Sequence, residues 1–301
     1  MTGKPDSGIV DRLRRGRVVF DGGMGSQLIA RGLEAGHPPE EWNRAHPKTV
    51  QEIHRAYADA GAEVITTNSF GGTPARLSAH GLGNDVVTLN NAAVRLARVA
   101  AATTAAGTRP RLVAFSMGPT GRILPPVGDA TERELESEFA AQLAGLSEPI
   151  DLVLIETVFD LREGLCALRA ARRMVSVPIG VTLTFKRTPR GFFTEMGDHV
   201  AASFAKLESA GAAFVGANCT IASSDMVDLA REMRGATALP LLCQPNAGAP
   251  DIEGGKPVYR QRPDAFAGDA IRMFETGVNA VGGCCGTTPE FIDELVRRLS
   301  R

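Results

Sequence analysis

The stretch Val278-Asn-Ala-Val-Gly-Gly-Cys-Cys-Gly-Thr-Thr-Pro289 contains an apolar run, a glycine-rich turn and the start of a helical segment. The apolar residues 278–281 have the length of a buried strand, and residues 289–299 have a helical pattern. A strand, a turn and a helix in this order form one strand–helix unit. The same unit recurs along the whole chain.

Eight such units can be traced, and strands that alternate with helices indicate parallel pairing with right-handed crossovers. Eight units fit a closed barrel better than an open sheet, so we predict a single (β/α)8 TIM barrel. The expected strands are residues 18–20, 63–67, 112–115, 152–155, 178–183, 214–217, 240–243 and 278–281. The expected helices are residues 50–60, 90–104, 132–146, 162–173, 200–210, 226–233, 265–275 and 289–299.

Active sites of such barrels lie at the C-terminal ends of the strands. In this sequence, reactive or polar residues stand at many of those positions. Two carboxylates and two cysteine loci are therefore expected to converge on one mouth of the barrel. The residues at the expected strand ends include Asp21, Glu156, Asn218, Cys219, Gln244, Asn246, Cys284 and Cys285.

The cysteines favour a metal site. Adjacent cysteines such as Cys284 and Cys285 rarely bond to each other, because the disulfide torsion strains the intervening peptide. Their flanking glycines allow a sharp turn that directs both sulfurs to one ion, and Cys219 at another strand end supplies a third thiolate. We predict zinc bound by Cys219, Cys284 and Cys285 at the C-terminal ends of the strands. The alternative, small buried apolar residues, is preferred for Cys166 and Cys243.

Three thiolates and one open position are more typical of a catalytic zinc than of a structural one. A thiol that binds as the fourth ligand loses its proton, although a free thiol is mostly protonated at neutral pH. A thiolate on such an electron-rich zinc stays nucleophilic. Alkyl transfer to sulfur is therefore the predicted reaction.

Asp21 and Glu156 are the expected anchors for a substrate ammonium group, and Asn218 and Asn246 are further expected substrate contacts. The turn from Gly22 to Gly25 precedes a helix and offers backbone N–H groups for a carboxylate. A helix cap or a turn residue is the alternative for Asp21.

The 301 residues carry a net charge of −1, which gives no electrostatic basis for binding nucleic acid or an anionic membrane. The absence of an apolar run of membrane-spanning length predicts no membrane association. Five cysteines suit a reducing compartment, so we expect a cytoplasmic protein. One barrel domain is expected over residues 1–301, with residues 1–15 as an N-terminal extension and an irregular loop at 246–263 over one mouth.

These stretches together resemble the homocysteine S-methyltransferase family, and the resemblance covers residues 18–299. The final stretch is highly specific. The matching stretches are Asp21-Gly-Gly-Met-Gly-Ser26, Ile65-Thr-Thr-Asn-Ser-Phe70, Gly118-Pro-Thr-Gly121, Glu156-Thr157, Gly216-Ala-Asn-Cys219, Gln244-Pro-Asn-Ala-Gly248 and Gly282-Gly-Cys-Cys-Gly-Thr-Thr-Pro289.

The resemblance implies a zinc-dependent barrel that methylates homocysteine to methionine. By resemblance, the three cysteines match the zinc thiolates, and Asp21, Gly22 and Glu156 match homocysteine-binding positions. The stretch around Asn246 is most similar to the homocysteine domain of cobalamin-dependent methionine synthase, where the matching asparagine can fill the fourth zinc position. The betaine-using branch is less similar, because it has a tyrosine where this chain has Thr157.

The chain has room for one barrel, whereas cobalamin-dependent methionine synthase has several modules. The methyl donor is therefore expected to be methylcobalamin on a separate protein or a small methylated compound, or else the natural acceptor is a thiol other than homocysteine. Two other functions remain open from the sequence. One is a component that moves methyl groups from a small methylated compound to a corrinoid protein, and the other is a noncatalytic zinc-binding module that docks to a partner.

Overall fold

The computed structural model describes residues 8–34, 36–102, 110–253 and 256–301. It contains one eight-stranded sheet with the order β1-β12-β9-β8-β5-β4-β3-β2, and every pairing within that sheet is parallel. The strands are β1 (Val18–Val19), β2 (Val64–Thr66), β3 (Leu112–Met117), β4 (Leu152–Val158), β5 (Ile179–Leu183), β8 (Phe214–Ala222), β9 (Leu241–Asn246) and β12 (Ala280–Val281).

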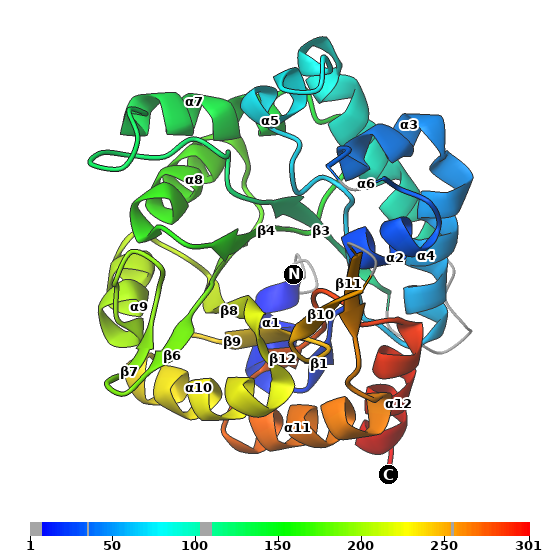
Figure 1. Ribbon diagram of the computed structural model, residues 1–301, viewed down its shortest axis with the longest axis vertical. Helices are drawn as coiled ribbons and strands as arrows, with labels where there is room; N and C mark the ends of the chain where they lie inside the picture. The colour runs from blue at the N-terminus through cyan, green and yellow to red at the C-terminus, as the bar shows by residue number, and fades with distance from the viewer. Residues whose placement is uncertain (1–7, 35, 103–109, 254–255) are drawn as a thin grey trace, which may run out of the picture.

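The two end strands of this order also meet. A parallel bridge joins Phe20 to Val64, and the Asp21 amide donates to the Val64 carbonyl at 3.1 Å. The sheet therefore closes into a ring, which Figure 1 shows with the helices arranged outside it. The predicted (β/α)8 barrel is confirmed, and all eight expected strands are present.

The helices that follow the strands cover the outside of the barrel. The N-terminus of α7 has a capping box between Thr131 and Glu134, and Pro47, Pro263 and Pro289 occupy first turns, where a missing N–H costs nothing. The expected helix at 90–104 begins four residues earlier, and its residues 103 and 104 lie outside the described part. The helices are α2 (Met24–Ala30), α4 (Pro47–Asp59), α6 (Val86–Ala102), α7 (Glu132–Leu143), α8 (Leu161–Met174), α9 (Val200–Ser209), α10 (Ser223–Ala236), α11 (Pro263–Glu275) and α12 (Pro289–Leu299), with short segments α3 (Trp42–Ala45), α5 (Pro74–Ser78), η1 (Pro39–Glu41) and η2 (Gly83–Asp85) between them.

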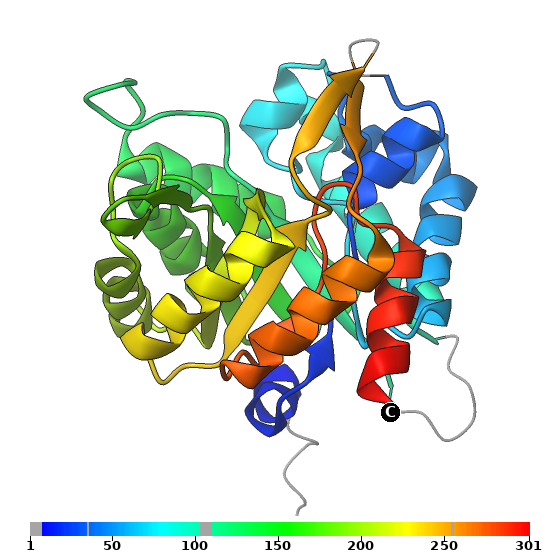
Figure 2. The ribbon, with the colours of Figure 1, turned by 60° about the horizontal axis from the view of Figure 1, so that its bottom comes forward.

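The barrel interior is a separate apolar core. Alternate strand residues such as Phe20, Leu154 and Phe214 pack together inside, whereas their neighbours contact the helices. Helix α1 (Ile9–Arg15) adds the fully buried Ile9 and Leu13 to this inner cluster. In Figure 2, α1 lies at one end of the barrel, which it therefore closes. The division of the chain into one domain with an N-terminal extension stays a prediction.

Two hairpins were not predicted. The expected irregular loop at 246–263 contains the antiparallel pair β10 (Pro250–Glu253) and β11 (Lys256–Tyr259), so its description as irregular was wrong. The sequence Gly254-Gly255 between two short extended segments was the available hairpin signal. Figure 2 shows this hairpin at the end of the barrel opposite α1. A second hairpin pairs β6 (Lys186–Thr188) with β7 (Gly191–Phe193).

Across the described residues, the helices include none with both the length and the apolar character needed to cross a bilayer.

Candidate metal and substrate site

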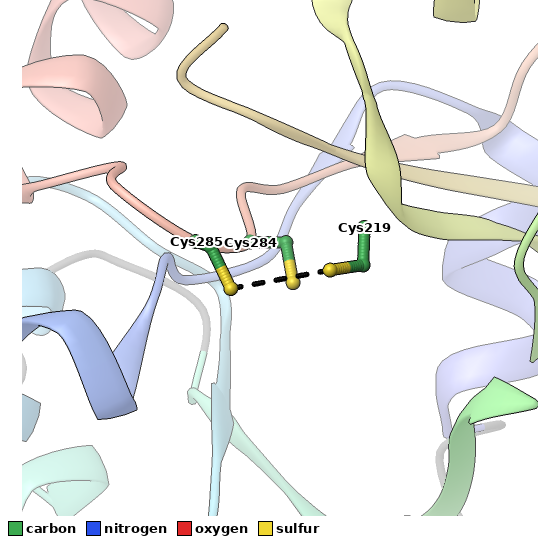
Figure 3. A group of neighbouring side chains, drawn as sticks. All are labelled: Cys219, Cys284 and Cys285. Carbon is green, nitrogen blue, oxygen red and sulfur yellow. Dashed lines mark hydrogen bonds between the residues drawn. The ribbon is translucent and has the colours of Figure 1, made fainter. Parts of the chain in front are cut away.

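Three cysteines from two strands meet at the C-terminal end of the barrel. The sulfurs of Cys219, Cys284 and Cys285 all lie within 4.8 Å of one another, and the Cys219 and Cys285 sulfurs are 3.9 Å apart. Figure 3 shows Cys219 reaching from β8 towards the two neighbouring cysteines on the turn after β12. Tetrahedral zinc with bonds of ~2.3 Å places its sulfur ligands about 3.8 Å apart. The three thiols therefore fit zinc.

The turn that carries Cys284 and Cys285 remains attached to β9. The Gly282 amide donates to the Cys243 carbonyl at 3.0 Å, and the Cys284 amide donates to the Pro245 carbonyl at 2.9 Å. Gly286 has a φ of +79°, a conformation that glycine adopts without strain. The parallel pairing is thus extended past the strand, and it fixes where the two sulfurs point.

Cys219 reaches the site through an unusual backbone. Cys219 and Thr220 have φ angles of +59° and +56°, and the pairing of β8 with β9 shifts register between Asn218 and Ala222. Left-handed conformations are costly for residues other than glycine, and they cluster at functional sites where the surrounding structure imposes them. The irregularity redirects the Cys219 side chain towards the barrel mouth.

The three thiols share their charge unequally. Hydrogen bonds from the Cys284 and Cys285 thiols lower the pKa of Cys219, and the same interactions with Cys219 raise the pKa values of its two neighbours. One thiolate is thus stabilised by two thiols, and a bound cation would favour ionisation of all three. Cys166 and Cys243 are fully buried, and burial raises both of their pKa values, as expected for packing residues.

Asp21 follows β1 and is buried, with 3% of its surface exposed. The backbone amide and the hydroxyl of Thr66 donate to its two carboxylate oxygens, each at 2.7 Å. Burial, with a smaller contribution from the charge of Glu156, nevertheless raises the pKa of Asp21 to about 7. The carboxylate therefore lacks a cation, and a substrate ammonium would supply one.

Glu156 lies at the end of β4. The Ser116 hydroxyl donates to it at 2.5 Å, yet burial and the nearby Cys219 raise its pKa to about 7. The side-chain nitrogen of Asn218 lies 3.5 Å from Glu156, 3.9 Å from the Cys284 sulfur and 2.7 Å from the Thr157 hydroxyl. Asn218 thus connects the carboxylate to the cysteines.

The Gly22–Gly23 turn lies directly against the cysteine turn. A Cβ atom on Gly22 would approach the Thr287 hydroxyl and the Tyr57 ring to 2.8 Å, so only glycine fits without a shift. The Tyr57 hydroxyl donates to the carbonyls of Gly23 (3.2 Å) and Thr287 (2.8 Å), and the Gly23 amide donates to the Thr287 hydroxyl. These bonds hold the two turns together.

Asn246 stands at the end of β9, close to the cysteines. Its side-chain oxygen accepts a hydrogen bond from the Cys285 amide at 3.1 Å, and its side chain helps to lower the pKa of Cys219. The oxygen is therefore already engaged in this structure. A role for it as a fourth zinc ligand stays a prediction.

A cavity of about 230 Å³ joins these groups, and several of its residues were not selected from the sequence. Inward-facing residues alternate along each strand, and the positions two residues beyond the apolar core carry polar side chains. This alternation is the signal that could have identified them. Thr66, Ser116, Glu156 and Gln244 of this polar layer line the cavity, and Glu40 and Phe70 complete it from the loops. Thr182 and Asn218 belong to the same layer but do not line the cavity.

A family profile described as homocysteine S-methyltransferase matches residues 18–299. The chain belongs to the homocysteine S-methyltransferase family. The family predicted from the sequence is therefore confirmed.

Two relatives of this chain are methionine synthases. The protein of Mycobacterium leprae (strain TN) is 30% identical over 312 residues, which cover 98% of this chain and 25% of the relative. The protein of Mycobacterium tuberculosis (strain H37Rv) is 31% identical over 311 residues, with 98% and 26% covered. The chain thus spans about a quarter of the length of these relatives.

A solved structure is similar over nearly the whole of both chains. The metallated form of the homocysteine methyltransferase MmuM from Escherichia coli has a TM-score of 0.79 and 25% identity, and the match covers 95% of this chain and 99% of that one. The likeness agrees with the (β/α)8 barrel described above.

Proposed function

We propose that this protein transfers a methyl group to the sulfur of homocysteine to form methionine, with zinc bound by Cys219, Cys284 and Cys285. The observation that carries the proposal is the convergence of three thiols within 4.8 Å of one another on the cavity that holds Asp21 and Glu156. Family membership supports it, as does the similarity to MmuM, whose structure was solved in a metallated form.

In this proposal the protein positions homocysteine at both of its ends. Asp21 and Glu156 bind the ammonium group, and the turn at Gly22 faces the carboxylate. Asn218 holds Glu156 and the Cys284 sulfur in a fixed relation. Zinc, when bound, supplies the Lewis acidity that removes the proton of a coordinating thiol. Holding the nucleophile in line with the methyl group then accounts for much of the acceleration.

The methyl donor and the cellular location belong to the proposal as well. Similarity to the methionine synthases favours methylcobalamin as the methyl donor, and similarity to MmuM over nearly the whole of both chains favours a small methylated compound. Five cysteines without disulfides suit a cytoplasmic protein, because a reducing compartment preserves the thiols.

Metal content and methionine formation test this function together. Replacing Cys219, Cys284 or Cys285 by Ala should abolish stoichiometric zinc and methionine production, while circular dichroism shows an intact fold. Cys166→Ala is the matched control, because that buried cysteine lies outside the cavity, and it should keep both. Full zinc content in the Cys284→Ala, Cys285→Ala double variant would contradict the proposal.

A further inference from the structure

Two turns with different proposed roles lie against each other at the barrel mouth. The turn after β1 carries Asp21 and Gly23, beside the proposed amino-acid site. The turn after β12 carries Cys284, a proposed metal ligand, and Thr287. Gly23 and Thr287 are 264 positions apart in the sequence, and the parallel pairing of β1 with β12 brings their turns together.

A chain of hydrogen bonds joins the two turns through the hydroxyl of Thr287, a fully buried residue. The Gly23 amide donates to this hydroxyl at 3.0 Å, and the hydroxyl donates to the Cys284 carbonyl at 2.6 Å. A second link runs between the backbones, because the Gly283 amide donates to the Asp21 carbonyl at 2.9 Å. One hydroxyl thus connects the backbone of the amino-acid site to the backbone of a cysteine.

Tyr57 supports the same contact from helix α4. Its side chain is fully buried, and its hydroxyl donates to the Thr287 carbonyl at 2.8 Å and approaches the Gly23 carbonyl at 3.2 Å. Tyr57 and Thr287 both belong to the described part of the chain, and neither of them lines the cavity. These two residues can therefore influence a bound ligand only through the turns that they hold.

The packing leaves the two turns no room to move independently. A Cβ atom on Gly283 would come within 2.2 Å of the Thr287 hydroxyl. A Cβ atom on Gly23 would lie 2.5 Å from the Cys284 carbonyl. Only glycine fits at both positions without a shift, so the backbones are in direct contact. Because tightly packed protein is barely compressible, a displacement of one turn is transmitted to the other.

We propose that Thr287 and Tyr57 are positioning residues that couple metal binding at the cysteines to amino-acid binding in the cavity. Each binding event restrains one turn, and the shared hydrogen bonds then order the other turn for the second ligand. This inference rests on the proposed function, because it requires zinc on the cysteines and an amino acid at Asp21. It extends that function by assigning the coupling to two residues outside the cavity.

The coupling is positive because each ligand orders what the other needs. Cys284 and Cys285 hold a metal ion at fixed bond lengths, so the turn that carries them is restrained when the site is filled. An amino acid bound at Asp21 restrains the turn after β1 in the same way. The ligand that binds second meets a turn that is already ordered, and it therefore binds more tightly. Homocysteine is thus bound best when the metal that activates its thiol is present.

L-2-Aminobutyrate is the probe that isolates this coupling, because it is homocysteine without the sulfur. It keeps the ammonium and carboxylate groups, and its side chain has no atom that can bind zinc. Calorimetry should show that zinc raises its affinity for the wild-type protein at least ~5-fold, the lower end of ordinary coupling between two sites. Because coupling is reciprocal, saturating 2-aminobutyrate should raise the affinity for zinc by the same factor in competition with a chelator.

Thr287→Val removes the hydroxyl and keeps the shape of the side chain. Zinc should change the affinity of this variant for 2-aminobutyrate less than ~2-fold. The variant alters no charge, so a direct electrostatic effect of zinc on the ammonium group would persist in it. Thr287→Ser retains the hydroxyl and should keep the full coupling. Thr288→Val is the matched control, because the Thr288 hydroxyl donates to Glu290 on α12, and it should behave as the wild type.

Coupling in the wild type, Thr287→Ser and Thr288→Val, with its loss in Thr287→Val, supports the inference. Equal coupling in the wild type and Thr287→Val overturns it. If Thr287→Val does not fold or bind zinc, Tyr57→Phe decides, since it keeps the ring, and full coupling in it overturns the inference. Zinc-containing wild type that binds 2-aminobutyrate without coupling, or does not bind it, overturns the inference alone. A wild type without stoichiometric zinc removes the proposed function as well.

Discussion

The affinity of the metal-free protein for methionine should fall steeply as the pH drops from 8 to 6. Asp21 and Glu156 both have pKa values of about 7 without a ligand, mainly because they are buried. An ammonium ligand favours the ionised carboxylates. Below pH 7 the protein must therefore release protons to bind, and affinity is lost as the pH falls. Methionine is the suitable probe because it has the ammonium group but no thiol proton.

The size of the effect follows from the two pKa values. A carboxyl group with a pKa of about 7 is ~90% ionised at pH 8 and ~10% ionised at pH 6, so each group lowers affinity ~10-fold over this range. Acting together, the two should lower affinity ~100-fold. Their mutual repulsion couples the titrations and spreads the change over a wider pH range.

Calorimetric titrations at pH 6, 7 and 8 with three variants would test this reasoning. Asp21→Asn and Glu156→Gln should each bind more weakly at pH 8, and each should lose only ~10-fold between pH 8 and 6, since one titrating group remains. Glu163→Gln should keep the full ~100-fold dependence, because its carboxyl group lies outside the cavity. A wild-type affinity that does not change with pH would refute the assignment of both carboxylates.

Three further predictions concern the metal, the turns and the core. Homocysteine binding to the zinc-containing protein should release close to one proton, measured by calorimetry in two buffers of different ionisation enthalpy, and Asn246→Ala should not change that number. Gly23→Ala places a Cβ atom 2.5 Å from the Cys284 carbonyl and should weaken zinc binding ~10-fold in a competition assay, whereas Gly25→Ala meets nothing within 4 Å and should not. His54 is buried without hydrogen bonds in the described structure, and burial lowers its pKa to about 3. Because His54 stays neutral in the folded state and gains a proton in the unfolded state below pH 6.5, acid favours unfolding. The gain in unfolding free energy from His54→Leu, measured with urea, should therefore grow by about 1.4 kcal/mol between pH 7.5 and 5.5.

The barrel could be predicted from the sequence because each unit repeats the same local pattern. Apolar runs such as residues 152–155 are long enough to be strands and too short to be ordinary helices, and the intervening segments have helical patterns. The two hairpins were missed for the opposite reason. Neither β6–β7 nor β10–β11 belongs to the repeating pattern, and each pairs only with its own neighbour.

Cys219, Cys284, Cys285, Asp21 and Glu156 could be chosen in advance because each lies within a few residues of the end of an apolar run. Their hydrogen-bond partners could not be chosen in this way. Ser116 reaches Glu156 and Thr66 reaches Asp21 because the registers of neighbouring strands place them side by side. Glu40 was harder still to predict as a cavity residue, since it lies in a short segment between α2 and α3 whose position depends on packing. No local pattern in that segment indicates that it faces the cavity.

The left-handed residues show why the geometry of the proposed metal site could not be predicted from its motif. The sequence placed Cys219 at a strand end, but a regular strand would continue to alternate its side chains across the sheet. At β8 the backbone instead enters the left-handed region at Cys219 and Thr220, and at β4 it does so at Thr157. Asn218 accepts hydrogen bonds from the Thr157 amide and the Thr182 hydroxyl, both at 2.8 Å.

The strain at β4 and the strain at β8 are therefore supported by one buried amide. Because Asn218 also approaches Glu156 and the Cys284 sulfur, the bonds that hold the strained backbone also orient these two side chains. The packed barrel core supports this arrangement, although it contains neither Glu156 nor Cys284. Binding of the proposed metal would thus require little reorganisation of Cys219, and the packed barrel beneath it offsets the cost of its backbone conformation.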